Sequence, residues 1–274
     1  MGETTQLRWL RRVGLAGFAV LVGLPLLVVV TTSLKPLADV DDAFRWLPSR
    51  LTLRPYVDMW STVPLGRYLL NSTVVAGATT LLALMVAVPA SYALARSRVR
   101  GRRTFILLLV ATQAAPGLLF LLPLFVLYAE LGDRSGLELI GTYPGLVLTD
   151  LTFALPFSIW LLTTHLESLS REVEDAASVD GAGTLGVIRH VVLPTAAPGI
   201  AAVGVFAFVL AWSEVLFASI LTQGQNQTLP VGLHAYASQS TVYWNQLAAA
   251  ALATSLPVLL GVLLGRRLLA RDEL

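Results

Sequence analysis

The sequence contains no cysteine and few charged residues. Without cysteine, the chain can form neither a disulfide framework nor a thiolate metal or redox site. Only 13% of its residues are charged, whereas a soluble domain has about 25%. The three histidines, His165, His190 and His234, lie far apart in the sequence. We therefore predict no metal site.

Several motifs of energy-converting and catalytic proteins are also missing. No Gly-x-x-x-x-Gly-Lys-Ser/Thr loop occurs, so any ATP-driven step needs an ATPase on another subunit. No His-Glu-x-x-His or Gly-x-Ser-x-Gly pattern occurs, which argues against an intramembrane enzyme. The sequence shows no inverted repeat, which counts against a self-contained secondary transporter. We expect a chain that is not an enzyme and that binds no cofactor itself.

What the chain does have is a high apolar content. Its 274 residues are 55% hydrophobic, with a mean hydropathy of +0.72. A membrane-spanning helix needs roughly 20 mostly apolar residues. This criterion predicts an all-α polytopic membrane protein with about six spans, at residues 13–33, 68–95, 104–128, 143–165, 199–222 and 247–264.

Basic residues in the short loops predict the orientation. They gather before the first span, between the second and third spans, and after the sixth, at Arg8, Arg11, Arg12, Arg96, Arg98, Arg100, Arg102, Arg103, Arg266, Arg267 and Arg271. Both termini are therefore expected in the cytoplasm. Residues 35–67, predicted on the outer side, carry several basic residues mixed with acidic ones, and they give weak evidence against this orientation. The basic run at 96–103 favours contact with anionic lipid, and we predict no nucleic-acid partner.

The polar break at residues 166–198 predicts two short helices joined by a glycine bend. Ser170 can cap the first helix, and Glu172, Glu174 and Asp175 suit its positive end. Gly181 can adopt the left-handed conformation that ends a helix. Pro194 is expected to stop the second helix, and the next span begins near Pro198.

This break resembles the EAA loop of bacterial ABC-importer permeases. The resemblance rests on Glu174-Asp175-Ala176-Ala177, Asp180-Gly181-Ala182, Leu193-Pro194 and Pro198. Asp175 replaces a usual second Glu, and Ile188 a common aromatic. The resemblance implies a cytoplasmic coupling helix between the fourth and fifth spans that docks into a groove of the ATPase. The implied coupling residues are Glu174, Asp175, Ala176, Ala177, Asp180, Gly181, Ala182, Leu193 and Pro194.

The resemblance extends along the chain, through Tyr92-Ala93-Leu94-Ala95-Arg96 and Trp212-Ser213-Glu214. It is closest to the second, maltose-permease-like subunit of the carbohydrate importers. It implies a single transmembrane domain over residues 1–274, with a permease core at 68–270 and an extracytoplasmic loop at 34–67. It also implies a bacterial inner-membrane location. The implied partners are a second homologous permease, an ATPase dimer that binds ATP and Mg, an extracytoplasmic sugar-binding protein and membrane lipid.

Two acids lie within the predicted spans, Asp150 in the fourth and Glu214 near the outer end of the fifth. Their predicted depths are similar, in the outer half of the membrane. An intramembrane acid is by default a candidate functional residue. We expect one or both, with Trp212, to face the translocation path or the partner permease. The alternative is an acid that reaches water at the membrane surface.

The predicted outer loop at 223–246 is polar and almost uncharged. Gln225, Asn226 and Gln227 are candidates for contact with the binding protein, and a plain connector is the alternative. Amide and aromatic groups suit a neutral sugar, and we expect a di- or oligosaccharide. Two alternatives stay open, namely a permease for another solute such as glycerol phosphate or a polyamine, and an ion-coupled carrier that uses Asp150 and Glu214.

Overall fold

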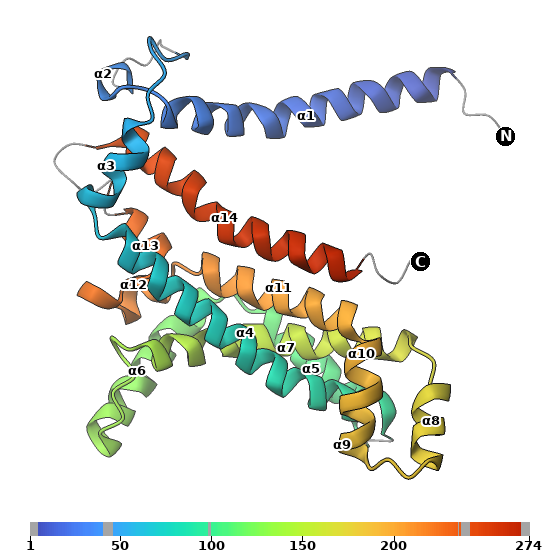
Figure 1. Ribbon diagram of the computed structural model, residues 1–274. Helices are drawn as coiled ribbons and strands as arrows, with labels where there is room; N and C mark the ends of the chain where they lie inside the picture. The colour runs from blue at the N-terminus through green and yellow to red at the C-terminus, as the bar shows by residue number, and fades with distance from the viewer. Residues whose placement is uncertain (1–4, 41–45, 98–99, 235, 237–241, 270–274) are drawn as a thin grey trace. The chain divides into compact units, whose positions relative to one another are not determined.

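A computed structural model describes residues 5–40, 46–97, 100–234, 236 and 242–269. All regular structure within these residues is helical, as expected (Figure 1). The longer helices are α1 (Thr5–Ser33), α4 (Leu65–Arg96), α5 (Arg102–Ala114), α6 (Leu118–Ser135), α7 (Tyr143–Ser168), α11 (Ala197–Ser213) and α14 (Trp244–Leu269). The chain divides into two compact units, one of residues 1–66 and 232–256 and the other of residues 67–231 and 257–274.

In the larger unit, α7 packs against both α5 and α11. Its sequence explains its start, because the Thr142 hydroxyl accepts a hydrogen bond from the Gly145 N–H and Pro144 occupies the first turn. Gly145 is required there, since an added Cβ would lie 2.0 Å from the Leu139 carbonyl oxygen. α7 then buries side chains around most of its circumference, with Leu146 in one apolar cluster and Leu162 in another.

The smaller unit contains the segment predicted as an outer loop. Before α4 begins at Leu65, the described residues of this segment, predicted at 34–67, form two short helices, α2 (Leu37–Val40) and α3 (Arg54–Thr62). Tyr236 donates to the Met59 carbonyl at 2.6 Å, and the Asn245 amide donates to the Lys35 carbonyl at 3.1 Å. These bonds tie α3 and the end of α1 to the segment that precedes and begins α14.

The described residues reach the predicted six spans if each of two bent helix pairs counts as one span. Within the part of the chain that the structure describes, four helices are individually long and apolar enough to cross a membrane, namely α1 (within Arg11–Ser33), α4, α7 and α14 (within Trp244–Leu263). Two bent pairs raise the number to as many as six. The predicted third span at 104–128 is not one straight helix, because α5 and α6 meet at 99° around Pro116. Proline cannot donate the backbone hydrogen bond that would continue α5.

The predicted fifth span at 199–222 is also wrong at both ends. Its helix α11 begins at Ala197 and ends at Ser213, and a separate short helix, α12 (Ala218–Leu221), follows. The Glu214 carboxylate accepts hydrogen bonds from the N–H groups of Phe217, at 2.7 Å, and Ala218, at 2.8 Å. This carboxylate starts α12 by occupying donors that an unbroken helix would direct to its own carbonyls.

Candidate functional site

The predicted coupling helix is α8 (Glu172–Val179). The Ser170 hydroxyl accepts from the N–H of Glu172, the first residue of α8, at 3.3 Å, although Arg171 and not Ser170 occupies the N-cap position. Gly181 has a φ of +88°, which confirms the left-handed bend. The N–H groups of Gly181 and Ala182 bond the carbonyls of Ser178 and Ala177. This pair of bonds is the Schellman arrangement that ends a helix after a left-handed residue.

The second arm of the break is longer than predicted. It runs through α9 (Thr184–Val187), the π-helical turn η1 (Ile188–Val192) and α10 (Leu193–Thr195). Pro194 therefore does not stop the helix, contrary to the prediction. The π-turn widens the helix immediately before Pro194, where a missing N–H and the proline ring would otherwise disrupt a regular α-helix. The chain bends by 80° only at Ala196, before α11.

Glu174 points inward and is buried, with 9% of its surface exposed. Its carboxylate receives three hydrogen bonds from Arg96 at the end of α4, two from Nε at 2.9 and 3.1 Å and one from Nη2 at 2.7 Å. Glu174 is thus committed to an ion pair within the chain. The basic run at 96–103 did not suggest this role for Arg96.

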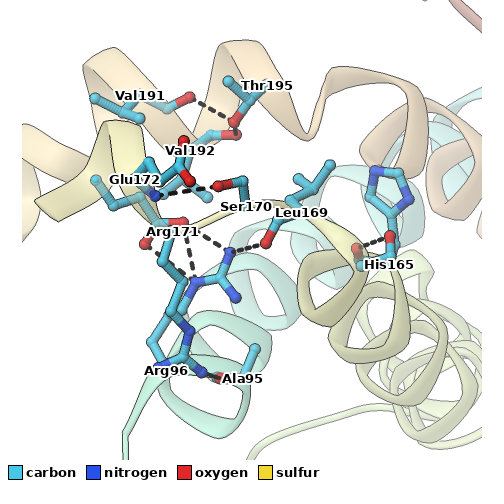
Figure 2. A network of polar contacts seen from close by, with 12 residues as sticks. Ala95, Arg96, His165, Leu169, Ser170, Arg171, Glu172, Val191, Val192 and Thr195 are labelled. Atoms are coloured by element: carbon cyan, nitrogen blue, oxygen red, sulfur yellow. Dashed lines mark hydrogen bonds and ion pairs between the residues drawn. The ribbon is translucent and has the colours of Figure 1, made fainter.

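A second set of bonds reinforces this connection, and Figure 2 shows its residues. Arg171 donates to the carbonyl of Ala95 at 2.7 Å, while Arg96 donates to the carbonyl of Leu169 at 3.4 Å. Each arginine therefore bonds a backbone carbonyl within two residues of the other arginine. Nearby, Arg102 at the start of α5 pairs with Glu167 at the end of α7.

The opposite side of α8 is open. Among the predicted coupling residues, Ala177 is half-buried, whereas the exposed ones are Asp175, Ala176, Asp180, Gly181, Ala182, Leu193 and Pro194. Sequence reasoning missed the apolar side chains beside them. Val179 is 87% exposed and Leu185 77% exposed, on either side of the Gly181 bend. The signal in the sequence was the presence of apolar residues within a polar loop. Exposed apolar side chains of this kind favour contact with another protein.

The two candidate acids have different environments. Asp150 lies in α7 and is almost fully buried, and neither carboxylate oxygen has a hydrogen-bond partner among the residues that the structure describes. Glu214 is half-buried and caps α12. Trp212 is buried at the end of α11 and stacks on Phe208. Of the two acids, Asp150 is therefore the one whose carboxylate has no hydrogen-bond partner among the described residues.

The candidate binding-protein residues lie on and beside η2 (Gly224–Asn226). The buried Asn71 amide of α4 donates to the carbonyls of Gln225, at 2.8 Å, and Gln227, at 2.7 Å. The Asn226 side chain turns inward and donates to the Gly141 carbonyl. Only Gln225 of the three is exposed, and Asn71 is a structural determinant of this loop that sequence reasoning missed.

Comparison with known proteins identifies the class to which this arrangement belongs. Residues 80–271 match the family model for the binding-protein-dependent transport system inner membrane component, and the chain belongs to that family. The protein is therefore a multi-pass inner-membrane component of an ABC transporter, a transport subunit rather than an enzyme.

Individual relatives cover most of the chain. The inner membrane ABC transporter permease protein YcjP of Escherichia coli (strain K12) is 33% identical over 93% of this chain and 90% of its own. The diacetylchitobiose uptake system permease protein NgcG of Streptomyces coelicolor is 35% identical over 89% and 80%. The maltose/maltodextrin permease protein MalG of Vibrio vulnificus is 32% identical over 74% and 69%.

A solved structure has the same fold. It belongs to a bacterial ABC transporter involved in the import of the acidic polysaccharide alginate. The TM-score is 0.79 with 21% identity, and the match covers 97% of this chain and 99% of that one. As a permease of this family, the chain works with an ATPase and a binding protein.

Proposed function

We propose that the chain is the permease subunit of an ATP-driven importer for a sugar, and that the exposed side of α8 docks on the ATPase. The observation that carries this proposal is the α8 surface around Gly181. It is exposed at Asp175, Ala176 and Asp180, it has a fixed bend, and it is flanked by the exposed apolar side chains of Val179 and Leu185. A short helix with small and apolar residues suits recognition in a groove.

A di- or oligosaccharide is the proposed solute. Two relatives of this chain are permease proteins named for maltose/maltodextrin and for diacetylchitobiose. The polar loop that contains Gln225 is also almost uncharged, which suits a neutral solute. A second homologous permease, two copies of the ATPase and a sugar-binding protein complete the proposed assembly. The ATPase supplies the ATP and Mg sites in this arrangement. Both termini of the chain and α8 lie on the cytoplasmic side.

Within this assembly we propose Asp150 as the acid of the translocation path. Its support is burial within α7 without a hydrogen-bond partner among the described residues, because a buried polar group normally finds a partner. Sugar hydroxyls passing the site would supply one. Uptake by Asp150→Asn and by Glu214→Gln, compared at equal membrane abundance, tests this role. Unchanged uptake by Asp150→Asn would refute it, and a loss confined to Glu214→Gln would assign the role to Glu214 instead.

The experiment that tests the proposed function is purification of the complex through a tag on this chain, expressed from its native locus. We expect an ATPase, a second permease and a binding protein to be recovered. The recovered binding protein is then screened against a panel of sugars by thermal shift. Recovery of this chain alone, with uptake that stops on collapse of the proton gradient and not on ATP depletion, would establish an ion-coupled carrier instead. Recovery of a binding protein that prefers glycerol phosphate or a polyamine would reassign the solute.

A further inference from the structure

The two ends of α4 carry buried polar joints to two different loops. At one end, Arg96 holds Glu174 of α8. Toward the other end, Asn71 holds the carbonyls of Gln225 and Gln227. About 38 Å of helix separates Asn71 from Arg96 at about 1.5 Å per residue. The helix is continuous between them despite Pro89.

The joint between α4 and α8 is the ion pair of Arg96 and Glu174, which is buried and in which both carboxylate oxygens accept hydrogen bonds. The side chains of Arg96 and Glu174 are only 8% and 11% exposed, so both charges are largely removed from water. A buried ion pair is weak evidence of stability, since apolar residues of similar volume often stabilise a fold as well or better. Its directional, bidentate geometry fixes the orientation of one element on another. This joint therefore has the properties of a positional constraint.

Among the described residues, α8 also contacts α9 and η1, and Tyr92 of α4 hydrogen-bonds Glu174. The chain that enters it is extended at Leu169, with φ −84° and ψ 139°, and the chain that leaves it turns at Gly181. Of the α8 side chains, Ala177 alone packs against the neighbouring apolar cluster described around Leu162 and Val192. The bonds from Arg96 to Glu174 and from Arg171 to the Ala95 carbonyl thus fix α8 to the end of α4.

The joint at the other end is equally complete. Asn71 is fully buried. Its amide nitrogen donates to two carbonyls of the 225–227 loop, and its amide oxygen accepts from the Tyr143 hydroxyl at 2.7 Å. Both donor hydrogens and the acceptor are used, so the loop backbone cannot shift relative to α4 without breaking a buried hydrogen bond.

We propose that α4 is the element that transmits movement between α8 and the 225–227 loop, with Arg96–Glu174 and Asn71 as its positioning residues. This inference rests on the proposed function, in which α8 meets the ATPase, and on Gln225 as the candidate contact for the binding protein. Movement of α8 displaces α4 along with it, because the buried Arg96–Glu174 ion pair fixes the position of one helix relative to the other. Asn71 then carries that displacement to the loop.

The test uses the complex purified through a tag on this chain and placed in lipid nanodiscs. The rate of ATP hydrolysis is measured with and without the recovered binding protein, for Glu174→Gln, Arg96→Gln, Asn71→Ala and the combination Glu174→Gln/Asn71→Ala. Each single variant should retain the ATPase and its basal hydrolysis. Stimulation by the binding protein should fall roughly tenfold, within the range that coupling between two sites spans.

Three comparisons separate transmission from a loss of folding. The exchange Arg96→Glu/Glu174→Arg should restore part of the stimulation, because it rebuilds the ion pair. The combined variant should lose no more than either single variant, since the joints act in series. Glu167→Gln serves as the matched control. It removes an ion pair with Arg102 whose side chains are 40% and 37% exposed, and exposed pairs contribute little.

The outcomes are distinct. Wild-type stimulation in Glu174→Gln or in Asn71→Ala overturns the inference, as do additive losses in the combined variant. Loss of the ATPase from the Glu174→Gln complex would show that Glu174 acts in docking itself, which overturns transmission and leaves the proposed function standing. Failure of the wild-type chain to recover an ATPase would refute the proposed function and the inference with it.

Discussion

The ring of His165 in α7 occupies the space that a side chain on Gly199 of α11 would need. A Cβ atom added to Gly199 would lie 2.1 Å from the Cδ2 atom and 2.5 Å from the Cγ atom of His165. Only glycine therefore permits this crossing. The two helices form one of the main packing contacts of the larger unit.

Replacement of Gly199 by alanine should force α11 away from α7. Overpacking of this kind costs about 2 kcal/mol, so we expect a lower melting temperature in detergent and reduced uptake. Gly77→Ala in α4 is the matched control, because an added Cβ there meets nothing within 4 Å. If Gly199→Ala melts at the temperature of the Gly77→Ala variant, the crossing has more room than the structure indicates.

At Gly181 the backbone, not space, sets the requirement. An added Cβ meets nothing within 4 Å, but φ is +88°. A left-handed conformation costs an ordinary residue about 1–2 kcal/mol, and asparagine tolerates it better. We expect uptake to decline from Gly181→Asn to Gly181→Ala.

Gly181→Asp should uncouple transport from ATP hydrolysis, because it adds a charge to the surface proposed to meet the ATPase. Normal uptake by Gly181→Asp would refute that docking role.

Asp150→Asn should not destabilise the protein. The carboxyl is buried and lacks a hydrogen-bond partner among the described residues, and burial of an unpaired polar or charged group is costly. The neutral, nearly isosteric amide should leave the melting temperature equal or higher. A marked fall would mean that an aspartate partner exists, such as a group on the second permease. The comparison is therefore made on the isolated chain and on the complex.

Glu214→Ala should loosen the start of α12. The variant loses both hydrogen bonds to the N–H groups of Phe217 and Ala218, and loss of a capping side chain typically costs about 1 kcal/mol. Glu214→Gln keeps one amide oxygen as an acceptor and should lose less. Thermal melting of the two variants checks the order, and equal melting temperatures would show that the cap contributes nothing.

Composition and local motifs predicted the features of the chain that depend on near neighbours in sequence. The apolar runs predicted helices close to α1, α4, α7 and α14. Ser170 and Gly181 predicted the start and end of α8, since capping depends on residues within one turn. Pro116 lies at the bend between α5 and α6, but the run at 104–128 predicted one span, because a proline alone does not determine an angle.

The contacts that position the site were not predictable, because they join distant parts of the sequence. Arg96 reads as one of several arginines in a basic loop, and nothing local distinguishes it as the partner of Glu174. Glu214 reads as an acid inside a helix, whereas its carboxylate ends one helical segment and starts the next. The π-turn before Pro194 depends on how the helix accommodates this proline. The pattern of residues does not predict whether a helix stops at a proline or widens before it.

The 99° bend between α5 and α6 has a consequence for hydration. The final carbonyls of α5 lie beyond the reach of its own N–H groups, and a lipid environment offers no replacement donors. A hollow of about 120 Å³ at this bend is lined by Thr112, Gln113 and Thr152 along with Phe120, Phe153 and Pro156, and it is large enough to hold water. The bend is thus a place where the bilayer interior must be kept away from the backbone, by water or by a neighbouring subunit.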